Sequence, residues 1–127
     1  MIPQDLKYSK SHEWMRIDGN VATVGISHYA QDQLSDVVFV EVPEVDQEIE
    51  QGGECAVIES CKIAAEMYTP AAGKVTAVNE ALEDDPALVN KDPYGDGWIF
   101  KLELSDASQL DGLMDAEAYK NHIAQSA

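Results

Sequence analysis

One stretch near the middle of the chain, Gly52–Gly73, constrains its fold more than any other. Two apolar runs, one over Cys55–Ile58 and one that ends near Met67, flank a polar break. Glycines bound the stretch at both ends and Pro70 closes the second run. This pattern of turn residues around apolar runs is typical of paired strands. Lys62 falls at the break. We therefore predict a β-hairpin over residues 52–73 that presents one lysine at its tip.

The lysine at this tip has two interpretations. Exposed lysines at turns commonly keep strand edges from pairing with other chains, which would make Lys62 a solvated surface group. The chain, however, has 8 basic residues against 24 acidic ones, so a single amine at a turn stands apart from an acidic surface. A mobile and reachable amine suits covalent modification. From Lys62 alone, the solvated surface group is the favoured interpretation.

The formal net charge of −16 limits the partners of the chain. Binding to nucleic acid or to anionic lipids depends on Lys and Arg, so we expect neither nucleic-acid nor membrane binding. Basic protein surfaces are the favoured partners. Met1–Asp5 lacks the apolar core of a signal peptide and the arginines of a transit peptide. We expect a bacterial cytoplasmic protein, or a mitochondrial-matrix protein if the chain is a processed eukaryotic product.

The cysteines and histidines indicate neither a disulfide nor a metal site. Cys55 and Cys61 lie six residues apart along one expected strand, which separates their Cα atoms by roughly 20 Å. A disulfide cannot span that distance, so we expect two free thiols in a reducing compartment. His12, His28 and His122 lack metal-ligand spacing. We expect His12 and His28 to be packing or capping groups.

Short strands separated by turn residues fill most of the chain, which predicts an all-β sandwich or barrel. Ser27 is the expected N-cap of a short helix over His28–Leu34. The apolar run at 36–42 predicts a strand buried on both faces. Helical spacing begins at about residue 106 and continues to about 125, with Asp115 as an N-cap. Other strands are expected at 12–17, 21–26, 74–79 and 98–104, with an irregular connection over 80–96.

The hairpin resembles those of lipoyl and biotinyl domains, in which a lysine at the tip carries a swinging cofactor. Glu59 lies three residues before Lys62, and Gly73 lies eleven after it. Biotinyl domains flank their lysine with methionines, whereas Cys61 and Ile63 flank Lys62. The lipoyl class is therefore the better match.

Segments outside the hairpin extend the resemblance to a family, the H proteins of the glycine cleavage system. They occur in the same order as in that family and cover nearly the whole chain. The resemblance implies a mainly β, barrel-sandwich hybrid fold of two antiparallel sheets, in one domain over residues 1–127. The segments are Leu6–Trp14, Val24–Ser27 with Ala30-Gln31, Asp36–Val40 with Pro43, and Pro86–Tyr94 with Gly97-Trp98.

The resemblance also implies a carrier without catalytic activity of its own. In the family, lipoate is joined covalently to the tip lysine, here Lys62, by a lipoyl-attaching enzyme. A pyridoxal-phosphate glycine decarboxylase loads the aminomethyl group, and an aminomethyltransferase passes it to tetrahydrofolate. Dihydrolipoyl dehydrogenase then reoxidises the arm. A lipoyl group on a flexible tether reaches each of these enzymes in turn at high effective concentration.

Family positions assign further roles to five residues. The loaded arm ends in a cationic amine, and Ser11, Glu13 and Glu66 match the positions that dock it, where a carboxylate offers a charge-assisted hydrogen bond. For Glu13 and Glu66 the alternative is a solvated strand or hairpin residue. Glu59 and Gly73 match positions that serve recognition during lipoylation. Their alternatives are turn stabilisation for Glu59 and a positive backbone φ at a tight turn for Gly73.

Departures from the family pattern at Cys61, Ile63 and Ala65-Glu66 keep two alternative functions open. The first is an H-like relay that passes lipoyl groups to other enzymes. The second is a thiol enzyme with Cys61 as nucleophile and His12 or His28 as base. A hairpin tip is too exposed for a water-excluded active site, which argues against the second. A thiol beside the arm also suggests exchange with its disulfide under oxidants.

Overall fold

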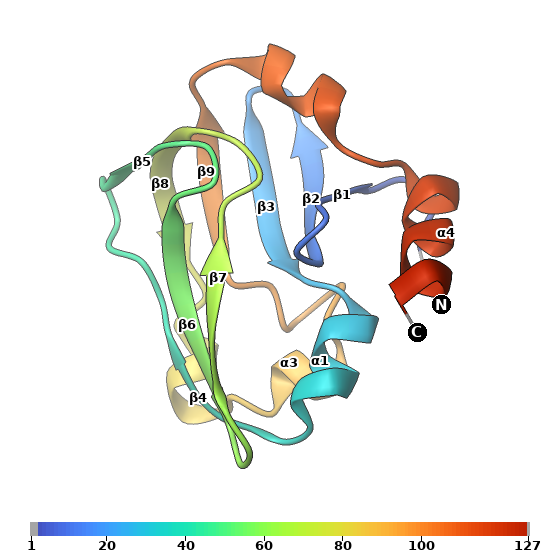
Figure 1. The fold of residues 1–127 in the computed structure, drawn as a ribbon. Coiled ribbons are helices and arrows are strands. Elements are labelled where there is room, and N and C mark those ends of the chain that lie inside the picture. Colours follow the sequence, from blue (N-terminus) through green and yellow to red (C-terminus); the bar gives the residue numbers. More distant parts are fainter. Residues whose placement is uncertain (1–2, 127) are drawn as a thin grey trace.

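Two antiparallel sheets make up the body of the protein, in a computed structural model that describes residues 3–126 (Figure 1). The larger sheet has the strand order β1-β2-β3-β9-β8-β5, and the smaller has the order β4-β6-β7. The strands are β1 Lys7–Tyr8, β2 Glu13–Asp18, β3 Val21–Ile26, β4 Val37–Glu41, β5 Glu48–Ile49, β6 Glu54–Ser60, β7 Ala64–Tyr68, β8 Gly73–Val78 and β9 Phe100–Leu104. The helices are α1 His28–Leu34, α2 Ala81–Asp84, α3 Leu88–Lys91, the 3-10 helix η1 Ala107–Gly112 and α4 Ala116–Ser126.

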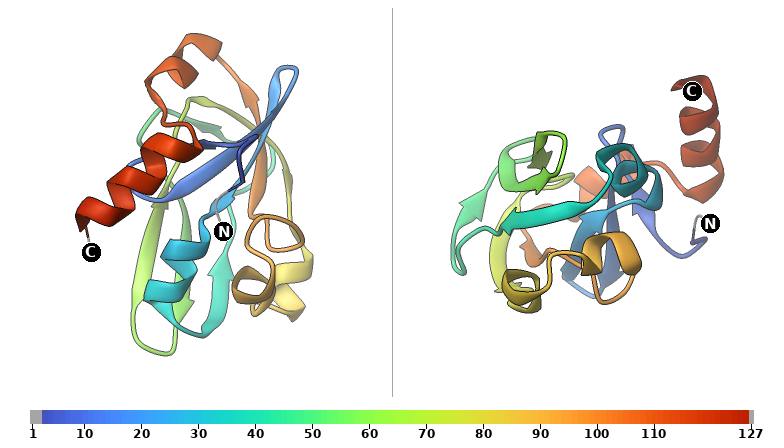
Figure 2. Two further views of the ribbon diagram at one scale, coloured as in Figure 1. Left: turned by 90° about the vertical axis from the view of Figure 1, so that its right-hand side faces the viewer. Right: turned by 90° about the horizontal axis from the view of Figure 1, so that it is seen from below.

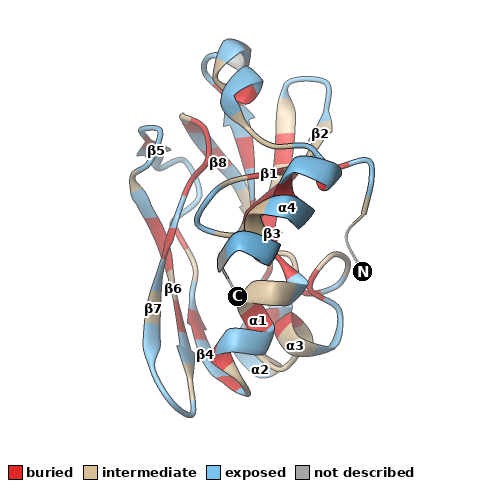
Figure 3. Cartoon of the chain, turned by 45° about the vertical axis from the view of Figure 1, so that its right-hand side comes forward, coloured by how far each residue is buried: buried red, intermediate tan, exposed pale blue. Residues whose placement is uncertain are grey.

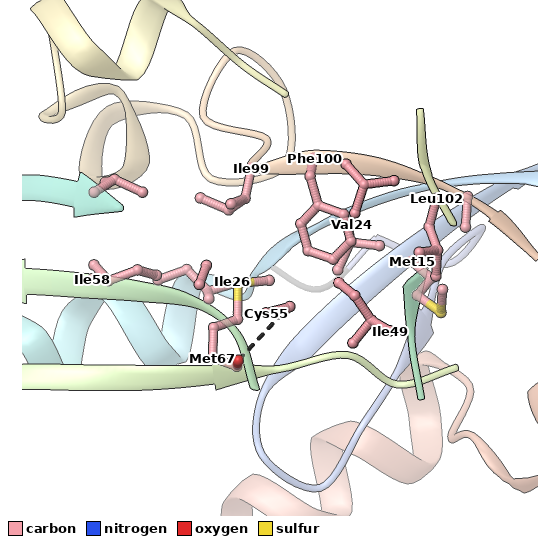
Figure 4. Close-up of a cluster of buried hydrophobic side chains, with 14 of the residues drawn as sticks. Met15, Val24, Ile26, Ile49, Cys55, Ile58, Met67, Ile99, Phe100 and Leu102 are labelled. Atoms are coloured by element: carbon pink, nitrogen blue, oxygen red, sulfur yellow. Dashed lines mark hydrogen bonds between the residues drawn. The ribbon is translucent and has the colours of Figure 1, made fainter. Parts of the chain in front are cut away.

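The core fills the space between the two sheets (Figure 4). Alternate residues of β9 point inward, so that Phe100, Leu102 and Leu104 are buried while the residues between them are exposed. The smaller sheet contributes Ile58 and Met67, both almost fully buried. Burial of apolar surface from both sheets is the main stabilising contribution to such a fold. The expected barrel-sandwich hybrid of two antiparallel sheets is confirmed.

The hairpin at 52–73 forms as expected from strands β6 and β7. Their register places Glu59 opposite Ala64 and Val57 opposite Glu66. The hairpin extends from the body with its tip exposed, at the bottom of Figure 1. Helix α1 also begins at the predicted residue, because the side chain of Ser27 accepts a hydrogen bond from the amide of Ala30.

Several short elements were not expected from the sequence. The two-residue strands β1 and β5 are too short to produce an alternating pattern. Two helical turns, α2 and α3, interrupt the connection over 80–96 that was expected to be irregular. No helix within residues 3–126 combines the length and apolarity needed to span a bilayer.

Strand β4 corrects one prediction, since it is not buried on both faces. Val37 and Val40 point into the core, but Val38 and Phe39 keep 56% and 48% of their surface exposed. A shift of register between Val37 and Phe39 marks an irregularity in the pairing with β6. An irregularity of this kind turns a side chain away from its expected face. β4 is also an edge strand of the smaller sheet, so half of its apolar run lies at the surface.

Gly73 corrects a second prediction, because its backbone φ is not positive. It is the first residue of β8, where it pairs with Ile49 of β5 and Leu104 of β9. A Cβ atom at this position would collide with the carbonyl oxygen of Glu103 and would lie 2.8 Å from Cγ of Leu102. Glycine is therefore required for close approach of two strands.

We expect Gly73→Ala to lower the free energy of unfolding by about 3 kcal/mol, because the obstructing atom belongs to the backbone and cannot rotate away. Gly112→Ala is the matched control, since a Cβ atom there meets nothing within 4 Å. Urea denaturation of both variants measures the difference. Equal midpoints of urea unfolding for the two variants would show that β8 and β9 can move apart with little loss of folding free energy.

Candidate functional site

The backbone at the hairpin tip is held by one serine. The hydroxyl of Ser60 accepts hydrogen bonds from the amides of Lys62, at 3.2 Å, and Ile63, at 3.1 Å, and the amide of Ser60 donates to the carbonyl of Ile63 at 2.8 Å. The amide of Cys61 donates to the carbonyl of Asp36 at 3.0 Å, which ties the tip to the chain just before β4. The turn is thus fixed while the Lys62 side chain is exposed.

The amine of Lys62 makes no ion pair within residues 3–126, where the ion pairs join Lys74 to Asp46 and Lys91 to Asp85. A lysine amine in water is a good nucleophile only once it has lost its proton, and the side chain of Lys62 is exposed to solvent. The predicted position of Lys62 at an exposed tip is confirmed by this geometry.

Glu13, the first residue of β2, is buried, with only 2% of its surface exposed. Its Oε1 accepts hydrogen bonds from the hydroxyls of Ser9 and Ser11, each at 2.5 Å. Its Oε2 accepts from the amide of Tyr68, the last residue of β7, at 3.3 Å. The carboxylate therefore links the two sheets, and the alternative of a solvated strand residue is wrong.

Burial raises the pKa of Glu13, although the hydrogen bonds from Ser11, Ser9 and the amide of Tyr68 oppose the rise. None of the ion pairs among residues 3–126 supplies a cation to this carboxylate. A buried carboxylate without a counter-ion disfavours its own charged form. Glu13 is thus a buried, hydrogen-bonded carboxyl group whose charged form is disfavoured.

A cavity of about 130 Å³ connects Glu13 with the neighbourhood of the tip. Ile63, which follows Lys62, lines the cavity together with Ser11, Glu13 and Glu66. Most of the remaining lining is apolar, which suits an aliphatic chain that ends in a polar group. The other lining residues are Ile26, Ala30, Gln33, Leu34, Ile58, Ala65 and Met67.

The structure thus brings Ser11, Glu13 and Glu66 to one cavity. Glu66 is exposed on β7, and its carboxylate accepts a hydrogen bond from the hydroxyl of Tyr68 at 2.6 Å. Glu59 lies outside the cavity, exposed on β6 near the tip. Gly73 lies in the other sheet and is buried, so the structure does not bring it to Lys62.

Both cysteines are free thiols, as expected. Cys55 is buried and its thiol contacts the carbonyl of Met67 at 3.2 Å (Figure 4), and burial raises its pKa. Cys61 is exposed at the tip. The ring of His12 contacts Tyr119, and that of His28 contacts Gln31. Among residues 3–126, no group of three or more His, Cys, Asp or Glu side chains is placed to hold a metal ion.

Sequence reasoning missed several residues of the site. Ser9 contacts Glu13 as closely as Ser11 does, and its spacing of four residues from Glu13 was the only available signal. The amide of Tyr68 and the apolar wall from α1 gave no signal, because they reach the site through pairing of distant segments.

An exposed lysine on a fixed hairpin tip, beside an apolar cavity that ends in a buried carboxylate, defines the class of swinging-arm carrier domains with a lipoyl-type fold. A family model described as Glycine cleavage H-protein matches residues 6–126. The chain therefore belongs to the glycine cleavage H-protein family.

Relatives and a solved structure agree with this membership. The chain is 58% identical over 118 residues to the glycine cleavage system H protein of Symbiobacterium thermophilum, covering 93% of this chain and 92% of the relative. It is 52% identical to the one from Staphylococcus haemolyticus, with 98% of each chain covered. A crystal structure of a glycine cleavage system H protein from Mycobacterium marinum superposes with a TM-score of 0.89 at 35% identity, covering 97% of this chain and 99% of that one.

Proposed function

We propose that residues 1–127 act as one lipoyl-bearing carrier domain of the glycine cleavage system, with lipoate attached to Lys62. The observation that carries the proposal is the cavity that joins the tip to Glu13. When bound, a lipoyl group supplies a dithiolane that accepts the aminomethyl group of glycine. The chain itself supplies attachment, docking and presentation, and catalysis belongs to its partners.

The residues present fit such a group. Lys62 is exposed and its backbone is fixed, so that a tether there moves about a defined point. The apolar walls of the cavity accept the aliphatic part of the arm, and Ser11, Glu13 and Glu66 supply acceptors for a terminal ammonium. A cation beside Glu13 offsets the cost of its buried charge. Docking thus favours the protonated amine.

We propose four partners of this carrier: a pyridoxal-phosphate glycine decarboxylase, a tetrahydrofolate-dependent aminomethyltransferase, dihydrolipoyl dehydrogenase and a lipoyl-attaching enzyme. Glu59, exposed three residues before Lys62, is proposed to serve recognition by the attaching enzyme. Gly73 would support that recognition indirectly, through the packing of β8 on β9. The net charge of −16 favours partners with basic surfaces around their active sites. The bacterial relatives support a place in the bacterial cytoplasm.

Intact-mass analysis before and after incubation with lipoate, ATP and a lipoate-protein ligase tests the attachment. We expect the mass to rise by one lipoyl group, and proteolytic mapping to locate it on Lys62. The lipoylated protein should then support release of CO₂ from glycine by the decarboxylase. A lipoylated protein that supports no decarboxylation would contradict the carrier role in glycine cleavage and would favour an H-like lipoyl relay.

A further inference from the structure

The C-terminal helix α4 packs beside strands β1 and β2 (Figures 2 and 3). Ala116 and Tyr119 of α4 are buried in a small cluster with Leu6, Tyr8 and Trp14, separate from the main core. The rings of Tyr8 and Tyr119 stack with centroids 4.5 Å apart and planes 2° from parallel. The helix is thus anchored on β1 and β2 through one aromatic stack.

Two side chains of α4 reach the turn between β1 and β2. The hydroxyl of Tyr119 lies 2.8 Å from Nδ1 of His12 and 2.5 Å from the hydroxyl of Ser27. One helical turn further, Nε2 of His122 lies 3.1 Å from the carbonyl oxygen of Lys10. These contacts join residues more than ninety positions apart. The helix therefore contacts the turn through side chains that do not line the cavity.

The backbone at His12 has a φ of +75°, a conformation that is uncommon outside glycine although His, Asn and Asp adopt it more often than other residues. Its carbonyl accepts from the amide of Ser27 at 2.9 Å, and its amide donates to the carbonyl of Ser9 at 3.1 Å. His12 lies between the two docking residues. Ser11 and Glu13 line the cavity, while His12 is directed to α4.

The protonation state of His12 agrees with this contact. Burial lowers its pKa, and the nearby His122, with ring centroids 5.6 Å apart, lowers it further. The neutral imidazole offers Nδ1 as an acceptor for the hydroxyl of Tyr119. The ring of Tyr29, 4.8 Å away, completes the surroundings.

We propose that Tyr119 is a positioning residue: its hydroxyl, through His12 and Ser27, holds the Ser9–Glu13 turn in the conformation that directs Ser11 and Glu13 into the cavity. The role in docking rests on the proposed function. The conformational role does not, because it concerns the unlipoylated chain. The helix α4 thereby sets the geometry of a site that it does not line.

Tyr119→Phe tests the proposal, since it removes the hydroxyl and keeps the buried, stacked ring. Tyr8→Phe is the matched control, because it also removes a buried hydroxyl from the same stack, one that donates to the carbonyl of Pro3 and not to the turn. The first readout uses unlipoylated protein. We expect exchange of the amide hydrogens of His12 and Glu13 to accelerate at least about fivefold in Tyr119→Phe, which loses the hydrogen bonds of the hydroxyl to both His12 and Ser27, and to stay unchanged in Tyr8→Phe.

The second readout is the NMR titration of the His12 ring in the same proteins. In Tyr119→Phe the pKa of His12 should move up toward its ordinary value, because a loosened turn hydrates the ring. His12→Asn provides a second variant, because an Asn oxygen can stand in for Nδ1 and Asn tolerates a positive φ. It should keep the exchange rates close to those of the wild type.

The third readout is the lifetime of the aminomethyl-loaded, lipoylated protein, expected to shorten about fivefold in Tyr119→Phe alone. Equal exchange rates in Tyr119→Phe and wild type would overturn the proposal, as would equal acceleration in both tyrosine variants. Fast exchange in His12→Asn would also overturn it. If the chain were not lipoylated, the proposed function would fail, while the exchange and titration results would still decide whether Tyr119 positions the turn.

Discussion

Replacement of Lys62 with arginine is expected to abolish lipoylation and, with it, all support of glycine decarboxylation. The guanidinium group keeps the positive charge and nearly the length of the side chain, but it does not lose its proton near neutral pH and so cannot attack an activated carboxyl group. The side chain is exposed, so the fold should not change. Intact mass after incubation with a lipoate-protein ligase, and CO₂ release from glycine, measure the effect.

Lys74→Arg is the control for this experiment, because Lys74 is another exposed lysine but lies on strand β8 of the other sheet, beside Asp46. It should gain one lipoyl group at the wild-type rate. Attachment of lipoate to the Lys62→Arg variant would show that another amine is used. The assignment of the hairpin tip as the attachment site would then be wrong.

Glu13→Gln is expected to shorten the lifetime of the loaded arm by roughly tenfold to a hundredfold, because a hydrogen bond to a charged group contributes about 1.5–3 kcal/mol. In water, the loaded group breaks down to formaldehyde, ammonia and the free thiol, and this requires the lone pair of the unprotonated amine. A carboxylate that favours the ammonium form slows that loss. Release of ammonia from isolated, loaded protein measures it.

Glu103→Gln is the matched control, since it removes one negative charge from an exposed position on β9. It should leave the lifetime unchanged. If both variants shortened the lifetime of the loaded arm equally, the overall charge of the protein, and not docking at Glu13, would protect the amine.

The same substitution has an expected effect on the unlipoylated protein. Because burial raises the pKa of Glu13, its contribution to stability is fully present below the unfolded pKa and is lost as pH rises through the folded pKa. The stability of Glu13→Gln relative to wild type should therefore increase with pH across that window. Chemical denaturation at a series of pH values measures the difference, and a constant difference would show that Glu13 is hydrated in solution.

Local sequence patterns were sufficient to predict the elements that local physics controls. The hairpin with Lys62 at its tip and the helix capped by Ser27 follow from turn residues and capping groups that lie within a few positions of each other. The N-cap at Asp115 is of the same kind, since its carboxylate accepts from the amide of Ala118 at 2.8 Å.

Features that depend on distant contacts were not predictable in this way. The burial of Glu13 comes from two serines before β2 and from the end of β7, more than fifty residues away. The exposure of Phe39 comes from a shift of register that an apolar run does not reveal. The positive φ expected at Gly73 was wrong, because glycine is required there by the carbonyl group of a neighbouring strand and not by a turn. The features that were predicted depend on residues close together in the sequence. Those that were not predicted depend on residues that only folding brings together.

The serine-held turn at the tip has a mechanical consequence. Because the hydroxyl of Ser60 accepts hydrogen bonds from the peptide groups on both sides of Lys62, the backbone of the hairpin tip contributes little motion of its own. A group attached to Lys62 would then move by rotation about the single bonds beyond Cα, and the length of the side chain and of the group would set its reach. The centre of that range of motion would stay fixed relative to the two sheets, because Ser60 holds the backbone around Lys62.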